Sequence, residues 1–175
     1  MPNNGANVEV GIFEIWANSR LVGHTKGGTE VTYGREFLDL TVDQFGSAPL
    51  DKALTGSSLE VKIMIAETTL QNLATAIPES RYDANAAVDS KMGIGRQAGF
   101  LLGSVAIPWR FHPVNRGATD FNKDLYIWKG VSSQPITASY KIDEQRVYEI
   151  TVTALVDETR IDGYYLGRIG DDTIS

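Results

Sequence analysis

The chain of 175 residues has no cysteine, so neither a disulfide nor a thiolate metal site can contribute to its fold. Its two histidines, His24 and His112, lack carboxylates or thiols at the spacing of a metal site, so we expect them to be exposed or hydrogen-bonded. No apolar run approaches a membrane span, and the first residues lack the basic and apolar regions of a secretory signal. We therefore expect a protein of a soluble compartment with no metal, no other cofactor and no membrane contact.

Motifs of catalysis are also scarce. No serine lies in a Gly-x-Ser-x-Gly elbow, and no cysteine can act as a nucleophile. Residues Gly93 to Gly99 imitate a phosphate-binding loop, but the third glycine comes one residue too late and a polar stretch precedes the loop where a strand is required. Carboxylates are plentiful, yet solvated surface acids are their usual role. The sequence therefore predicts no enzyme.

Composition favours one β-rich domain over residues 1–175. With 42% hydrophobic and 22% charged residues, the chain can bury one sizeable core. Its 17 glycines and 6 prolines are spread along the chain, which is typical of many strands separated by turns. The net charge of −6 argues against tight binding of nucleic acid, which needs clustered cations. We expect a mainly β fold, a β-sandwich or barrel, with one flanking α-helix and a long extended hairpin arm.

Residues Ser58 to Pro78 carry the clearest local pattern. Leu59, Val61, Ile63 and Ile65 alternate with polar or small residues, which predicts a half-buried strand over 58–66. After residue 66 the spacing of the apolar residues changes from that of a strand to that of a helix. Thr68 and Gln71 form a capping-box pattern, and Pro78 ends a short helix whose apolar stripe is formed by Leu70, Leu73, Ala74 and Ile77.

The segment of about residues 34–56 is predicted to be an assembly arm. The chain is extended from Thr29 to Val42, but its apolar phase slips across Gly34, so that the stretch from Arg35 to Phe45 exposes apolar groups on both faces. Such strands invite pairing with other chains. We expect Pro49 to Leu54 to form a single helical turn that closes the arm and ends at Gly56. The alternative is a long bulged strand lying wholly within its own domain.

Other strands and turns are expected along the rest of the chain. They are a phase-slipped strand over Val8–Trp16, a short strand and glycine turn over Leu21–Gly28, a surface excursion over Tyr82–Lys91, a strand over Gly99–His112 with an edge or bulge at Pro108, and a strand over Asp124–Lys129. The strongest hairpin pattern pairs Ile136–Ile142 with Tyr148–Val156 across Asp143–Gln145.

Several blocks of the sequence resemble, in order and spacing, the major tail tube proteins of long-tailed bacteriophages. The family is related to the tube proteins of contractile tails and type VI secretion. The blocks are Asp39–Gln44, Asp51–Gly56, Ala66–Leu70, Tyr140–Tyr148, Thr151–Asp157 and Leu166–Gly170. The resemblance spans most of the chain, and Glu79–Met92 has no counterpart in the family.

This resemblance implies a structural virion protein that is not an enzyme. Its copies would form six-fold rings, assembled in the bacterial cytoplasm, that stack into a hollow tail tube. Through this conduit genomic DNA is ejected into the host cell. The implied partners are further copies of the chain, a tape-measure protein, a tail terminator and baseplate or tip proteins. Double-stranded DNA would pass through without tight binding.

Two sets of residues would carry this function. Contacts between rings and subunits would fall to the arm, with Phe37, Leu38, Leu40, Val42 and Phe45 as apolar anchors and Asp39, Asp43, Asp51 and Lys52 as polar partners. The lumen would be lined by Glu60, Lys62, Met64, Glu149, Thr151 and Thr153. Lys62 is the exception in this acidic set. Either Glu60 or Glu149 of a neighbouring subunit neutralises it, or it does not face the lumen.

Three other interpretations stay open on the sequence. A tube of a contractile or secretion-type injection machine would share the fold and differ in its partners. A small-ligand-binding β-barrel would need an apolar interior cavity. An enzyme would need convergent acids or a metal.

Overall fold

One antiparallel sheet of eight strands makes up most of the computed structural model, which describes residues 11–84, 89–136, 142–143 and 145–171. The strand order is β2-β1-β7-β8-β9-β4-β3, and β10 pairs with β8. The strands are β1 (Phe13–Ala17), β2 (Arg20–Leu21), β3 (Thr25–Thr41), β4 (Pro49–Ile65), β7 (Ile107–Pro113), β8 (Leu125–Ser132), β9 (Tyr148–Leu155) and β10 (Gly167–Ile169). The described residues also contain one α-helix, α1 (Leu70–Ala76), two 3₁₀ turns, η2 (Asp43–Phe45) and η3 (Leu102–Val105), and a small hairpin of β5 (Arg81–Ala84) and β6 (Ser90–Gly93). The expected mainly β fold with one flanking helix and a long hairpin is confirmed.

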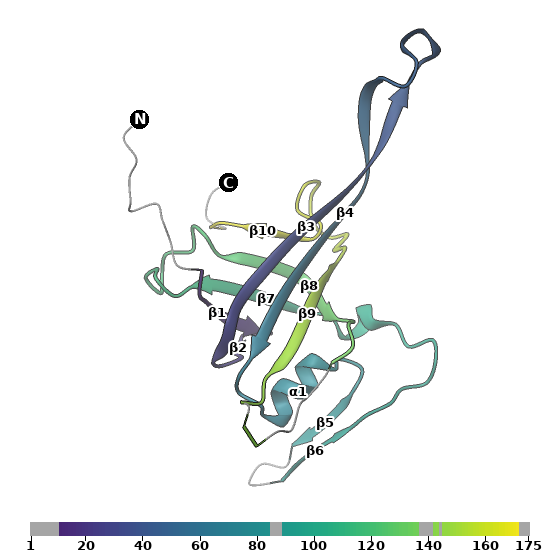
Figure 1. Ribbon diagram of the computed structural model, residues 1–175. Helices are drawn as coiled ribbons and strands as arrows, with labels where there is room; N and C mark the ends of the chain where they lie inside the picture. Colours follow the sequence, from purple (N-terminus) through teal and green to yellow (C-terminus); the bar gives the residue numbers. More distant parts are fainter. Residues whose placement is uncertain (1–10, 85–88, 137–141, 144, 172–175) are drawn as a thin grey trace.

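The core lies between the two halves of the bent sheet, where β3, β4 and β9 cross in front of β1, β7 and β8 (Figure 1). The expected alternation on β4 is confirmed, because Leu59, Val61, Ile63 and Ile65 are all buried. Trp109 and Phe111 of β7 stack at 6.3 Å between ring centroids within the same core. Burying each side chain of this size stabilises the fold by about 1.5–3 kcal/mol.

Helix α1 begins one residue later than the sequence indicates. Thr69, and not Thr68, is its N-cap: the Thr69 hydroxyl accepts a hydrogen bond from the backbone N–H of Asn72 at 3.1 Å. Thr68 instead accepts a hydrogen bond from Arg146. The expected apolar stripe is also only partly right, because Leu70 is exposed while Asn72 is buried. The Asn72 amide donates to the carbonyls of Val22 and Glu67, so a polar side chain attaches the helix to the body.

Segment 49–54, expected to be a helical turn, is strand. It belongs to β4 and pairs with β3 through the opposed residues Phe37 and Leu54, Leu38 and Ala53, Asp39 and Lys52, and Leu40 and Asp51. Cross-strand hydrogen bonds and side-chain pairs therefore replace the helical turn, and the hairpin reverses at η2 instead. Gly56 is a strand residue opposite Glu36 and does not end a helix.

The expected glycine turn near residue 28 is a β-bulge within β3. Gly27 and Gly28 have positive φ angles of 88° and 85°, and the pairing of β3 with β4 shifts register between Thr25 and Thr29. Glycine suits these positions because it has no Cβ to clash. The expected irregularity at Pro108 is confirmed by the register shift between Ile107 and Trp109.

Two other expectations have different outcomes. The surface excursion over Tyr82–Lys91 contains parts of β5 and β6, which pair with each other. The predicted hairpin of Ile136–Ile142 with Tyr148–Val156 lies partly outside the described residues, as do Val8 and Val10 of the first predicted strand. The second strand of that hairpin is confirmed as β9, which pairs with β4 and with β8.

Candidate assembly arm and polar sheet face

The paired outer halves of β3 and β4 project from the body as a two-stranded arm, residues 34–56, with η2 at its tip (Figure 1). Six large apolar side chains of this arm are each between 45% and 63% exposed. They are Phe37, Leu38, Leu40, Phe45, Leu50 and Leu54. Because successive strand residues point to opposite faces, Phe37 and Leu38 expose apolar surface on both sides of the arm. The sequence predicted this two-sided exposure.

The arm residues predicted to act as anchors are thus exposed, except Val42, which is half-buried. Sequence reasoning missed Leu50 and Leu54. Interpreting residues 49–54 as a helical turn concealed the pairing of Leu54 with Phe37 across the hairpin.

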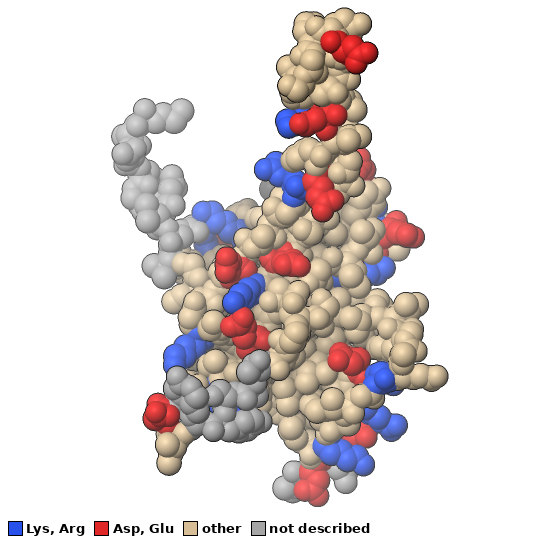
Figure 2. Space-filling model, turned by 45° about the vertical axis from the view of Figure 1, so that its right-hand side comes forward, with Lys and Arg blue, Asp and Glu red and all other residues tan. Residues whose placement is uncertain are grey.

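The charged residues of the arm are mostly acidic. Figure 2 shows Asp and Glu side chains from the base of the arm to its tip. The Lys52 ammonium binds Asp39 Oδ1 across the hairpin at 2.6 Å, and the Lys52 backbone N–H donates to Asp51 Oδ1 at 2.7 Å. Both side chains of the ion pair are at least half exposed, so the pair adds little stability. Asp43 begins η2 at the tip.

The structure brings together all six residues predicted to line the lumen. In the pairing of β4 with β9, Glu60 lies opposite Thr153, Lys62 opposite Thr151, and Met64 opposite Glu149. All six alternate with buried core residues, so they share the outer face of the sheet. Sequence reasoning missed Glu30 and Thr32 of β3, which lie opposite Lys62 and Glu60 on the same face. We call these eight residues the polar face.

Lys62 is neutralised within its own chain and needs no neighbouring subunit. Its Nζ lies 2.7 Å from Glu149 Oε1, and this hydrogen-bonded carboxylate raises the pKa of Lys62 above its ordinary value. The Thr153 hydroxyl lies 3.5 Å from Glu60 Oε1. With Lys62 and Glu149 balanced, Glu30 and Glu60 leave the polar face acidic.

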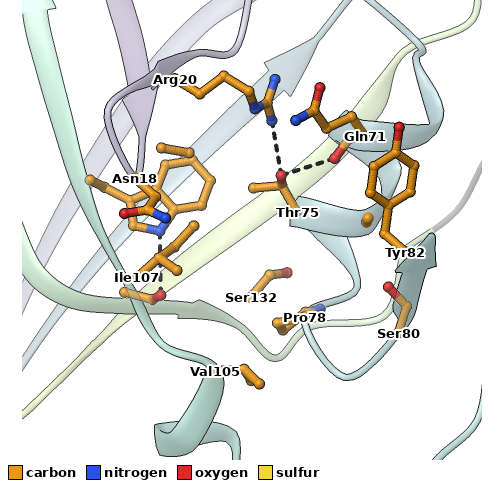
Figure 3. A pocket seen from close by; sticks show the side chains of 14 residues that line it. Asn18, Arg20, Gln71, Thr75, Pro78, Ser80, Tyr82, Val105, Ile107 and Ser132 are labelled. Atoms are coloured by element: carbon orange, nitrogen blue, oxygen red, sulfur yellow. Dashed lines mark hydrogen bonds between the residues drawn. The ribbon is translucent and has the colours of Figure 1, made fainter. Parts of the chain in front are cut away.

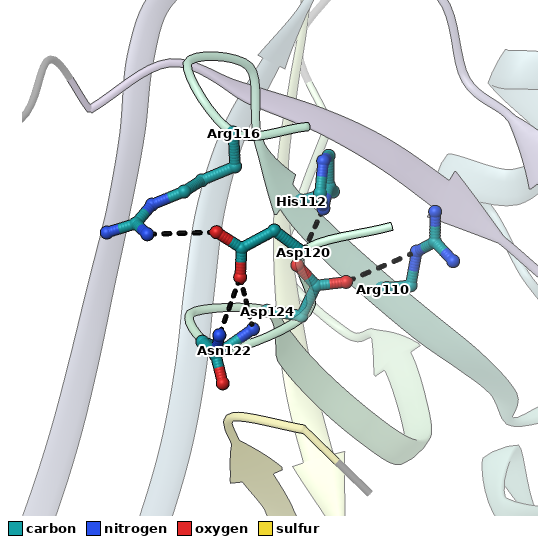
Figure 4. A network of polar contacts seen from close by, with 6 residues as sticks. All are labelled: Arg110, His112, Arg116, Asp120, Asn122 and Asp124. Atoms are coloured by element: carbon teal, nitrogen blue, oxygen red, sulfur yellow. Dashed lines mark hydrogen bonds and ion pairs between the residues drawn. The ribbon is translucent and has the colours of Figure 1, made fainter. Parts of the chain in front are cut away.

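His112 belongs to a buried network of polar contacts (Figure 4). Its Nδ1 lies 2.7 Å from Oδ1 of Asp124, whose other oxygen lies 3.6 Å from Arg110 Nε. His112 and Asp124 are both buried. Nearby, Arg116 binds Asp120 at 2.9 Å, and this hydrogen bond lowers the pKa of Asp120 below its usual value. Burial of the His112–Asp124 pair indicates a role in folding, consistent with the hydrogen-bonded histidine expected from the sequence.

A pocket of about 360 Å³ lies between α1 and strands β7 and β8 (Figure 3). Its lining mixes polar and apolar side chains. Arg20 is held at its edge by hydrogen bonds to Asn72 at 2.8 Å and Thr75 at 3.0 Å, and burial lowers the pKa of Arg20. A barrel that binds an apolar ligand needs an apolar interior cavity. This pocket, with a guanidinium at its edge, does not have that character.

Two further properties of the described residues bear on function. They contain no group of three or more His, Cys, Asp or Glu side chains placed to hold a metal ion. None of the helices in the described ranges has the length and apolar character needed to cross a bilayer. In comparisons with known proteins, no family model matches the chain, and no curated protein matches it significantly.

Proposed function

We propose that the protein is the subunit of a phage tail tube, a structural virion component that polymerises as stacked rings into a hollow conduit for double-stranded DNA. The observation that carries this proposal is the projecting arm with apolar side chains on both faces. A two-stranded ribbon alone is marginally stable in water, and an exposed apolar surface of this kind marks an interaction site. Other copies of the chain provide the cover.

The sheet edge supports assembly into rings. Strand β3, with 17 residues, ends the order of the large sheet, and no other strand of the described residues pairs with its outer edge. A long edge strand is a template for pairing with another chain. When the edge of each subunit pairs with its neighbour, the sheets join around a ring and the edges disappear.

The polar face supports the role of a conduit. If subunits join at β3, the outer faces of β3, β4 and β9 from successive copies form one continuous wall. Glu30 and Glu60 make this wall acidic, and each phosphate of a passing duplex is repelled by like charge. Tight binding requires clustered Lys and Arg that replace counterions on DNA. The balanced Lys62–Glu149 pair supplies no such cluster.

Assembly of the purified protein tests the proposal. We expect sedimentation velocity to show large particles whose fraction rises with concentration, because burial of the arm and the β3 edge depends on neighbours. Negative-stain electron microscopy of the same samples should show rings and hollow tubes. A monomer that persists unchanged at all concentrations would contradict the proposal.

Reversing charge on the polar face tests its role separately. Tubes of the variant Glu30→Lys/Glu60→Lys, which keeps the Lys62–Glu149 pair, are expected to retain double-stranded DNA at low salt. Retention should fall steeply as salt rises, because phosphate binding releases counterions. Co-sedimentation with labelled DNA measures the difference from wild-type tubes. The variant Glu158→Lys serves as a control, because it makes the same kind of substitution at an exposed residue outside the polar face. DNA retention no greater than that of this control would show that the polar face does not line the channel.

A further inference from the structure

The end of the subunit away from the arm tip carries a groove. It is formed by the C-terminal end of α1 with residues 76–79, by the segment 94–102, and by residues 132–136, and its volume is about 640 Å³. In Figure 1 the arm tip lies at one end of the molecule, and α1 and the chain that follows β6 lie toward the other. We call this feature the distal groove.

The distal groove offers apolar surface and one positioned cation. Ile94 lines it and is 72% exposed, and Ile77, Phe100, Leu102 and Ile136 contribute further apolar lining. Arg96 stacks over the Phe100 ring at 5.0 Å, and its Nε donates to the backbone carbonyl of Glu79 at 2.8 Å. These two contacts hold the guanidinium at the groove. Glu79 is also part of the lining.

The arm tip has the complementary chemistry. Phe45 and Leu50 are 63% and 60% exposed at the reversal of the hairpin. Asp43 and Asp51 lie beside them, and Lys52, the nearest cation along the chain, already binds Asp39 at 2.6 Å. The tip therefore presents apolar side chains together with carboxylates, which match an apolar groove that contains a guanidinium.

We propose that the arm tip of one copy docks into the distal groove of the next copy. This inference rests on the proposed function and identifies the acceptor surface for the arm. Because the arm tip and the distal groove lie at opposite ends of the folded subunit, the contact is heterologous and repeats without closing. Each added subunit layer presents a new set of arms, so the contact generates a filament.

A second groove is a poorer acceptor. It has a volume of about 550 Å³ and lies at the base of the arm, where Val31, Tyr33 and Leu54 face the segment 162–169. If the arm tip bound there, two antiparallel copies could each fill the other's groove. Such an isologous contact closes into a dimer and leaves no site for growth. The geometry of open stacking therefore favours the distal groove.

The variant Ile94→Asp tests the acceptor. Ile94 is 72% exposed, so we expect the fold to be unchanged by circular dichroism and thermal melting. A charge in the docked interface should raise the protein concentration needed for tube growth more than about tenfold, equivalent to about 1.4 kcal/mol. Isolated rings should remain in electron micrographs. Ile161→Asp, at a residue 74% exposed and outside both the groove and the arm, is the matched control and should form tubes.

Mixing two variants tests the pairing of tip with groove. Phe45→Asp keeps an intact groove, and Ile94→Asp keeps an intact arm, so neither should form tubes alone. When separately purified rings are mixed, the arms of one variant should dock in the grooves of the other. The expected product is a stack of two rings that cannot grow further.

The outcomes separate this inference from the proposed function. If wild-type protein forms tubes and Ile94→Asp forms them equally well, the distal groove is not the acceptor. The inference also fails if the control Ile161→Asp blocks growth as strongly, if the mixture gives no two-ring stacks, or if arm-dependent closed dimers form. If wild-type protein forms no tubes at any concentration, the proposed function itself is wrong.

Discussion

Leu40→Glu is expected to abolish tube formation while leaving the subunit body folded. Leu40 is 45% exposed on the arm, and the buried core lies in the body, so the substitution removes no core contact. In the assembled tube, the new carboxylate would be taken out of water without a partner, which costs several kcal/mol per subunit. It would also face Asp51 directly across the hairpin, and like charges in that position repel. Because every ring repeats the penalty, we expect growth to stop completely.

Sedimentation velocity and negative-stain microscopy measure this loss, and circular dichroism reports the fold. Leu40→Met keeps the apolar contact and should assemble. Leu70→Glu is the matched charge control, because Leu70 is 40% exposed and begins α1, where an acidic residue is favourable. Tubes formed by Leu40→Glu at the wild-type concentration would show that the arm does not carry assembly.

The parts of the fold that could be predicted from the sequence were those that the hydrophobic periodicity determines by itself. Alternation of apolar and polar residues fixed which side of β4 and β9 is buried, so the six predicted polar-face residues fall on one face. The two-sided arm was predictable because its apolar phase slips. The slip was placed at Gly34, whereas the register shifts of the arm lie between Glu36 and Phe37 and between Leu40 and Thr41. A slip in the pattern reveals that a bulge exists but not where the partner strand accommodates it.

The parts that sequence missed depend on contacts between distant residues. Residues 49–54 include Leu, Lys and Ala, which favour helix locally, but pairing with β3 overrides that preference. The tight turn between β1 and β2 uses Asn18 and Ser19, both at positive φ, without the glycine that identifies such turns in sequence. Sequence analysis named Glu149 as a possible partner of Lys62 but placed it in a neighbouring subunit. The ion pair within one chain, and Glu30 as a member of the polar face, follow only from the observed strand registers.

His112→Leu is expected to lower the free energy of unfolding by about 1–3 kcal/mol, the usual cost of leaving a buried hydrogen-bonding group without its partner. Asp124 is 0% exposed and would lose its nearest partner, His112 Nδ1 at 2.7 Å. Arg110 Nε, at 3.6 Å, is too distant to replace that hydrogen bond. Urea denaturation followed by tryptophan fluorescence measures the change. A loss below about 1 kcal/mol, within the range of exposed pairs, would contradict the assigned role.

The double variant His112→Leu/Asp124→Leu distinguishes loss of a hydrogen-bond partner from loss of packing. If the penalty comes from an unpaired buried carboxylate, removing that carboxylate should recover most of the lost stability. Arg110 would still be placed over the rings of Trp16 and Phe121, and its side chain is 28% exposed and can be hydrated. Asp120→Asn breaks the more exposed Arg116–Asp120 pair and should shift the urea midpoint far less. A double variant as unstable as the sum of its single variants would mean that shape complementarity, and not charge, governs this site.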